Sequence, residues 1–163
     1  MTLRALASVA LLSCAARPIT PPASTPPPSA QPALSARQSP ASDLVYFVMV
    51  DRFANGDPTN DGDIDLADPQ AFHGGDLQGV IDHVDHLQSL GVRTVWLSPI
   101  FQMRTTKIDE WGAFHGYWVK DLTRVEPRFG TADELRDLSR DLHRRDMKLV
   151  LDMVWNHTDY DAP

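Results

Sequence analysis

The sequence has a single cysteine, Cys14, among its 163 residues, so the chain cannot form an internal disulfide bond. It also has no acidic residue before Asp43, and all 22 acidic residues begin at that position. Set against 12 of the 15 basic residues, they give residues 43–163 a net charge of −10. This balance argues against binding to a nucleic-acid backbone and suits a neutral partner.

The amino terminus has no apolar run long enough to span a bilayer, since the run at positions 6–12 is only seven residues long. Arg4 precedes this run, so residues 1–14 are predicted to be an export signal. Leu11-Leu12-Ser13-Cys14 resembles a bacterial lipobox, which predicts lipidation of Cys14 and a membrane-anchored lipoprotein. The alternative is ordinary cleavage at the following alanines, which discards Cys14 and secretes the protein.

Residues 15–42 form a second segment with few side chains to bury. Eight of the 13 prolines lie between positions 17 and 42, among serine, threonine, alanine and glutamine. Such a composition does not build a packed core, so a disordered linker is predicted here. Function is therefore expected in residues 43–163.

Two kinds of periodicity alternate from position 43 onward. Apolar runs of strand type occupy 44–50, 92–97 and 148–154, and apolar residues at helical spacing occupy 77–90 and 131–142. The run at 44–50 is unbroken, which predicts a parallel strand buried on both faces. The order β-α-β-α-β fits either a doubly wound open sheet or the beginning of a (β/α)₈ barrel.

Long polar segments follow each of the first two predicted strands, at 51–76 and 99–130. Asn156 and His157 come just after the third. The carboxyl ends of parallel strands share one rim, where barrel enzymes build their active sites. We therefore expect these three segments to converge on one site.

The first segment alternates carboxylate and amide side chains with glycine and proline between Asp51 and Asp63. Calcium prefers such oxygen donors on a sharply folding chain, although the spacing is not that of an EF-hand. An ordinary surface loop uses the same residues, so composition alone leaves both interpretations open.

Aromatic and polar residues alternate from Trp111 to Asp121, a pattern that suits stacking against sugar rings but also covers hydrophobic cores. After the third strand, Asp152 is predicted to point into a barrel near its rim, where a buried carboxylate requires a partner. For His157 taken alone, a structural role is favoured over a functional one.

Four motifs together resemble the α-amylase family, glycoside hydrolase family 13. Leu151 to His157 resembles its D-x-x-x-N-H region, and His115 to Asp121 resembles its H-G-Y-x-x-x-D segment. The stretch 91–99 resembles its second barrel strand, and Asp51-Arg52-Phe53 with Gly74-Gly75-Asp76-Leu77 completes the order. The resemblance covers about residues 45–160. It implies the first three β-strands and two helices of an incomplete (β/α)₈ TIM barrel, an α/β fold.

The resemblance also implies roles for individual residues. Tyr117 matches the tyrosine that stacks under the sugar at the cleavage subsite, and His157 matches the histidine that bonds a hydroxyl of that sugar. Asp152 matches the aspartate that orients the site by pairing with a later arginine. Asn156 matches a calcium ligand of many members.

A further likeness concerns the first loop, which is similar to the amino-terminal calcium site of cyclodextrin glycosyltransferases and some bacterial amylases. The implied cofactor is calcium, and the implied ligands are Asn55, Asp57, Asn60, Asp61, Gly74 and Asp76.

The implied function is that of an exported, retaining glycoside hydrolase or transglycosylase acting on α-1,4-glucosidic bonds of starch or maltodextrin. The family places its nucleophile and acid/base on the fourth and fifth strands. No residue up to Pro163 is therefore expected to be a catalytic carboxylate, and this chain alone is expected to be inactive. One alternative is a catalytically dead, amylase-like carbohydrate-binding or scaffold lipoprotein, and another is an unrelated small α/β lipoprotein.

Overall fold

The computed structural model describes residues 43–160 and 162. The predicted signal at 1–14 with its lipidation site Cys14, and the predicted linker at 15–42, lie outside the described residues. Among the residues that are described, no helix has the length and apolar character needed to cross a membrane.

A three-stranded parallel sheet forms the centre of the fold, in the order β1-β2-β5. The strands are β1 (Leu44–Val48), β2 (Val92–Leu97) and β5 (Lys148–Leu151). Both strand pairs are parallel, which confirms the β-α-β-α-β order read from the sequence.

Two of the three strands are shorter than predicted. β1 stops at Val48 because the chain turns into the short helix α1 (Val50–Phe53), whose first amide is bound by the Ser98 hydroxyl at 3.1 Å. β5 stops at Leu151 because its partner β2 ends opposite it at Leu97. Residues 49–50 and 152–154 are therefore not strand.

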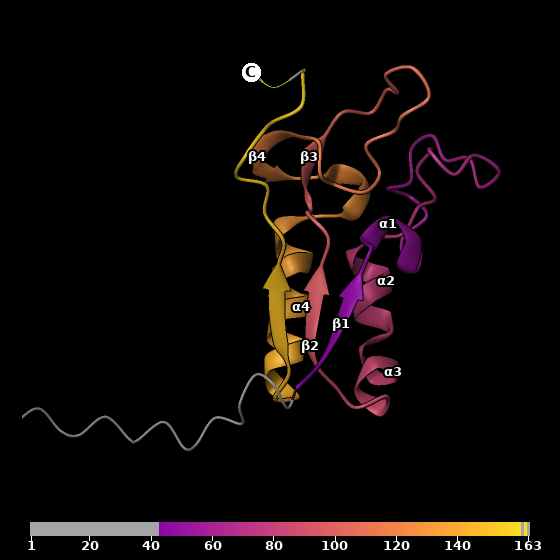
Figure 1. Cartoon of the computed structure of the whole chain (residues 1–163). Helices are drawn as coiled ribbons and strands as arrows, with labels where there is room; N and C mark the ends of the chain where they lie inside the picture. Colours follow the sequence, from indigo (N-terminus) through magenta and orange to yellow (C-terminus); the bar gives the residue numbers. More distant parts are fainter. Residues whose placement is uncertain (1–42, 161, 163) are drawn as a thin grey trace, which may run out of the picture. The chain divides into compact units, whose positions relative to one another are not determined.

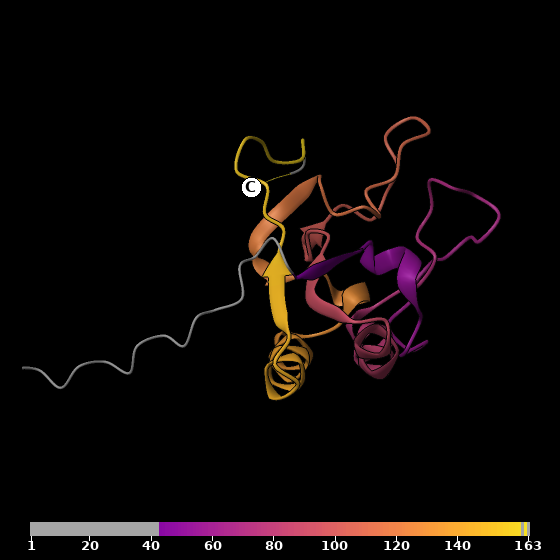
Figure 2. The same cartoon turned by 60° about the horizontal axis from the view of Figure 1, so that its bottom comes forward.

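Helices cover one face of the sheet, as Figures 1 and 2 show. They are α2 (Leu77–Asp82), α3 (Val84–Ser89) and α4 (Ala132–Arg144). The single helix predicted over 77–90 is divided at His83, whose backbone leaves helical geometry. A capping box begins α4, since the side chains of Thr131 and Glu134 bond reciprocally to each other's backbone amides.

The opposite face of the sheet is bare in the part of the chain that the structure describes. Residues 44–47 of β1 are between 37% and 52% exposed, so the prediction of a strand buried on both faces is wrong for this structure. Phe47 of β1 lies edge-on to Trp96 of β2, with ring centroids 5.4 Å apart. On β2, the helices bury Val95 and Leu97, which alternate with Trp96.

The segment between β2 and α4 contains more regular structure than the predicted loop. β3 (Phe101–Met103) pairs antiparallel with β4 (Val119–Val125), and the 3₁₀ turn η2 (Pro127–Phe129) follows. The buried carboxylate of Glu126 holds this unit together by accepting from the Met103 amide at 3.0 Å and pairing with Arg128. In Figure 1 the β3-β4 pair lies beyond the carboxyl ends of the parallel strands.

Candidate functional site

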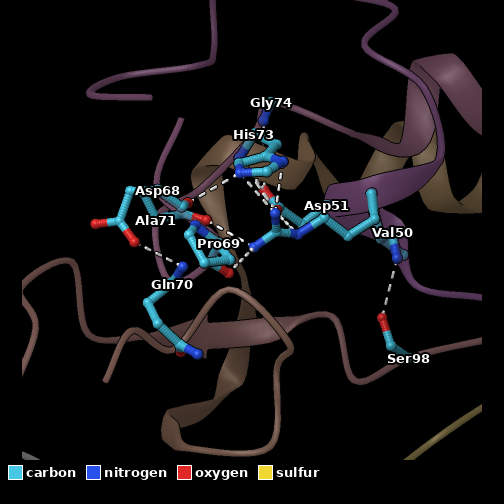
Figure 3. Close-up of polar contacts among 10 residues, drawn as sticks. Val50, Asp51, Asp68, Pro69, Gln70, Ala71, His73, Gly74 and Ser98 are labelled. Carbon is cyan, nitrogen blue, oxygen red and sulfur yellow. Dashed lines mark hydrogen bonds and ion pairs between the residues drawn. The ribbon is translucent and has the colours of Figure 1, made fainter. Parts of the chain in front are cut away.

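The first loop, residues 51–76, is anchored by the buried carboxylate of Asp51. It accepts from the backbone amide of His73 at 3.0 and 3.1 Å and from that of Gly74 at 3.4 Å (Figure 3). It also pairs with Arg52 at 2.9 Å. Burial raises the pKa of Asp51, although the His73 amide and the Arg52 guanidinium act in the opposite direction. The two ends of the loop are thus held together.

Arg52 extends this anchor to the next loop. Its guanidinium donates to the carbonyls of Pro69 at 2.9 Å and Ala71 at 2.8 Å, and it contacts the His73 ring. It also lies 3.8 Å from the centroid of the Phe114 ring, which belongs to the second polar segment. A cation stacked on an aromatic face in this way ties the first loop to the residues just before Tyr117.

The predicted calcium ligands of the first loop gather around Gly74 and Asp76. The Asn55 amide nitrogen lies 2.7 Å from the Asp61 carboxylate. Gly74 has a positive φ of 89°, a backbone conformation that other residues rarely adopt, and an added Cβ would lie 2.7 Å from that carboxylate, so the position favours glycine. Asp76 accepts from the amides of Gly56, Asp57 and Gly79, and so caps α2.

Other members of the predicted set differ in what they contact. The Asn60 side-chain oxygen is buried with no hydrogen-bond partner, so its lone pairs can coordinate a cation. The Asp57 carboxylate instead accepts from the hydroxyl and amide of Thr59, which lower its pKa. Asn156 is exposed and lies apart in sequence, after β5.

Acidic, histidine and cysteine side chains alone do not make a metal centre here. Among the residues that the structure describes, no three of them are grouped closely enough to hold an ion. The predicted ligands are the side-chain amides of Asn55 and Asn60, the Gly74 carbonyl and the carboxylates of Asp57, Asp61 and Asp76. An all-oxygen set of this kind suits calcium rather than a transition metal.

The three predicted sugar-binding residues are brought together at the rim. The Tyr117 hydroxyl donates to Asp152 at 2.9 Å, and His157 Nε2 donates to the Tyr117 carbonyl at 3.0 Å. Burial, then the hydrogen bond to Asp152, raises the pKa of Tyr117 to about 12, so the phenol stays protonated. In the described residues the partner of Asp152 is thus Tyr117, whereas the sequence predicted a later arginine.

His115 opens the H-G-Y-x-x-x-D segment, but the sequence analysis assigned it no role. Its Nδ1 accepts from the Tyr117 amide at 3.0 Å, and its ring stacks on the Tyr117 ring at 5.7 Å and meets Trp118 edge-on at 4.6 Å. Burial and the nearby Arg104 lower the pKa of His115, which favours the neutral ring that this bond requires. Its position in the same motif, two residues before Tyr117, was the sequence feature that could have indicated a role at the site.

Arg104 and Asp159 form a second feature that the sequence did not reveal. Arg104 donates twice to the Asp159 carboxylate, at 2.7 and 2.8 Å, and both side chains are at most 4% exposed. Arg104 also lies 4.4 Å from the centroid of the Trp118 ring. The residues are 55 positions apart, so no local pattern could have paired them.

Comparison with known proteins identifies the family. Residues 47–162 match the alpha amylase catalytic domain. The chain is 39% identical over 116 residues to alpha-amylase 2 of Schwanniomyces occidentalis, covering 71% of this chain and 23% of that protein. It is 38% identical over 132 residues to the periplasmic alpha-amylase of Escherichia coli K12, covering 71% and 19%.

Solved structures agree with the sequence comparison. A crystal structure of an Anoxybacillus alpha-amylase shares 48% identity with a TM-score of 0.69, covering 74% of this chain and 25% of that chain. An alpha-amylase from Geobacillus thermoleovorans, solved in complex with acarbose, shares 40% identity with a TM-score of 0.61, covering 74% and 24%. The chain thus spans about a quarter or less of these relatives. The match over most of its own length shows that the chain belongs to the α-amylase family of glycoside hydrolases.

Proposed function

We propose that this chain supplies part of the catalytic barrel of an exported, retaining glycosidase or transglycosylase that acts on α-glucans such as starch or maltodextrin. The observation that carries the proposal is the contact of Tyr117 with both Asp152 and His157 at the carboxyl rim of the sheet. Two polar segments meet there, and the stacking of Arg52 on Phe114 brings the first loop next to them, as an oligosaccharide cleft requires.

Each of the three residues has a distinct task in this proposal. The half-buried Tyr117 ring offers an apolar face for a pyranose ring. His157 is exposed and directs its remaining ring nitrogen away from the Tyr117 carbonyl, toward a sugar hydroxyl. Asp152 fixes the phenol by accepting a hydrogen bond from its hydroxyl, so the aromatic face is oriented before substrate arrives.

A retaining mechanism needs two carboxyl groups about 5 to 5.5 Å apart, one a nucleophile and one an acid and base. We assign neither role within residues 43–160. Asp152 is engaged by Tyr117 and serves to position it. The proposal places the reacting carboxylates on further strands of the same barrel, packed against the bare face that includes Phe47 and Trp96.

Calcium belongs to the proposal as a structural ion of the first loop. Asn55, Asn60, Asp61, the Gly74 carbonyl and Asp76 would hold it, with Asp57 and, at a separate site, Asn156 as further candidates. The unpartnered oxygen of Asn60 and the close approach of Asn55, Asp61 and Gly74 support this. The ion would supply a rigid cross-link between the two ends of the loop.

Export is proposed from residues 1–14, with lipidation at Cys14 and residues 15–42 as a tether to the membrane surface. One relative, from Escherichia coli, is a periplasmic alpha-amylase. α-Glucan polymers outside the cytoplasm are then the accessible substrates.

Isothermal titration calorimetry tests the proposal. It measures the binding of maltoheptaose to the complete product of the gene that encodes this chain, whatever its length. Tyr117→Ala should weaken binding at least about 10-fold, the cost of losing an aromatic stacking contact. Leu122→Ala, on an exposed position of β4, serves as the control and should leave binding unchanged. A wild-type protein that is folded but binds no α-glucan would refute the proposal.

A further inference from the structure

Arg104 is a buried cation to which the proposed function gives no role. Its side chain is 4% exposed. It donates two hydrogen bonds to the Asp159 carboxylate, one to the Thr106 carbonyl at 3.0 Å and one to the Trp111 carbonyl at 3.2 Å. Burial of a charge is costly unless an opposite charge and hydrogen bonds compensate it, and here both are present. Arg104 is therefore held in one position, from which it can fix its neighbours.

A row of packed rings leads from Arg104 to Tyr117. The Arg104 guanidinium lies 4.4 Å from the centroid of the Trp118 ring, where a cation is attracted to the aromatic face. Trp118 meets His115 edge-on with ring centroids 4.6 Å apart, and His115 stacks on Tyr117 at 5.7 Å. Each ring in the row thus limits the movement of the next.

Asp159 holds the same stretch of chain through its backbone. Its amide donates to the carbonyl of Val119 at 2.7 Å, and Val119 directly follows Trp118 in the sequence. The ion pair between Arg104 and Asp159 therefore fixes the backbone next to Trp118 as well as the Trp118 ring.

The charge of Arg104 also acts on His115. The Nδ1 atom of His115 accepts from the Tyr117 amide at 3.0 Å, which requires that this nitrogen carries no proton. Burial, and then the charge of Arg104, lowers the pKa of His115 and so preserves this acceptor. In the described residues, the other titratable or charged groups against the His115 ring or its aromatic neighbours are Tyr117, Asp152 and Arg52.

We propose that Arg104 is a positioning residue of the Tyr117 site, which fixes Tyr117 through Trp118 and His115, and that Asp159 holds Arg104 in place for this task. The inference rests on the proposed function, because the effect to be measured is on the binding of an α-glucan. Arg104 and Asp159 act through other side chains, since both are almost fully buried.

The test is a double-mutant cycle on the complete gene product, with maltoheptaose affinity measured by calorimetry. Arg104→Met combined with Asp159→Asn removes both charges together, so that no buried charge is left without its partner. This charge-free pair is made in the wild type and in Tyr117→Ala. Arg124→Gln is the matched control, because Arg124 is an exposed arginine of β4.

The charge-free pair should weaken maltoheptaose binding about fivefold in the wild type and less than about twofold in Tyr117→Ala, because the effect passes through Tyr117. Arg104→Lys keeps the charge but loses the planar group over Trp118, and should weaken binding in the same direction. NMR should show the His115 ring titrating at higher pH in the charge-free pair than in the wild type, with His115→Gln identifying its signal.

Equal losses of affinity in both backgrounds, as a general loss of structure would give, would overturn the inference. So would a lowered melting temperature with unchanged affinity, or an unchanged titration of His115. Arg124→Gln should match the wild type in each measurement. A wild-type protein that folds and binds no maltoheptaose would instead refute the proposed function, and the inference with it.

Discussion

The hydroxyl of Tyr117 donates to the carboxylate of Asp152 at 2.9 Å, joining two residues that are 35 positions apart. Tyr117 precedes β4 and Asp152 follows β5, so the bond connects the second polar segment to the end of the third parallel strand. His157, which lies in the same segment as Asp152, donates a second hydrogen bond to the Tyr117 carbonyl. Within the described residues, Tyr117 is therefore held in place by two residues of the segment that follows β5.

Removing only the hydroxyl of Tyr117 separates two effects, the positioning of the ring by Asp152 and the stacking of the ring on a sugar. Tyr117→Phe keeps the ring but deprives Asp152 of its donor, and should lower the free energy of unfolding by about 1 kcal/mol. Affinity for maltoheptaose should stay within about threefold of the wild type, since the apolar face remains. Urea unfolding and calorimetry of the complete gene product measure the two effects. Tyr160→Phe is the control, because the Tyr160 side chain is almost fully exposed. A Tyr117→Phe protein that loses sugar binding altogether would contradict the assigned role of the ring.

His115 should make stability depend on pH. Its pKa is lowered in the folded protein, so above the unfolded value of about 6.5 both states are neutral and its full stabilising effect is present. As the pH falls below about 6.5, the unfolded chain takes up the proton first and stability is lost. The urea midpoint of the wild type should therefore fall more between pH 7.5 and 5 than that of His115→Gln. The exposed His86→Gln is the control and should follow the wild type. Parallel pH profiles for the wild type and His115→Gln would exclude this role.

The calcium proposal predicts a change in thermal stability that does not depend on activity. Calcium at about 100 times its dissociation constant should stabilise the complete gene product by about 2.7 kcal/mol, and a chelator should reverse the effect. Asp61→Ala removes a carboxylate beside Asn55 and Gly74 and should abolish the response. Asp63→Ala changes an exposed aspartate of the same loop and should preserve it. A melting temperature that is indifferent to calcium and chelator would rule out a structural ion in this loop.

The bare sheet face makes a prediction about the 163-residue chain expressed on its own. Phe47 and Trp96 expose aromatic surface that further barrel strands are proposed to cover, so this chain should bind a hydrophobic dye strongly. The double variant Phe47→Ser and Trp96→Thr should reduce the dye fluorescence severalfold. Leu66→Ser, at a position 71% exposed in the first loop, should not. Equal dye binding by all three proteins would show that this face is not responsible.

Features set by neighbouring residues were predictable from the sequence. The capping box of α4 needs only Thr131 and Glu134, three positions apart, and β2 follows from the apolar run that begins after Gly91. The convergence of Tyr117, Asp152 and His157 was also predictable, because their motifs follow strands of one parallel sheet.

Features that depend on distant partners were not predictable. The Arg104–Asp159 ion pair and the β3-β4 pairing join segments that are distant in the sequence. The local pattern of apolar and polar residues does not indicate that such segments are in contact. The break at His83 arises because its ring bonds to the Gly79 carbonyl at 2.7 Å, a side-chain interaction that competes with the continuing helix. β1 was predicted to be buried because its apolar run is continuous, but its burial depends on what packs against the second face of the sheet.

The measurement that tests the central claim most directly is proton NMR of the anomers released when the complete gene product is incubated with maltoheptaose. A retaining α-glucan glycosidase should cleave the substrate and release the α-anomer first, with the β-anomer appearing only by mutarotation. Initial release of the β-anomer would contradict the retaining mechanism. A folded product that binds maltoheptaose without cleaving it would contradict the enzymatic claim and support a catalytically inactive, carbohydrate-binding lipoprotein.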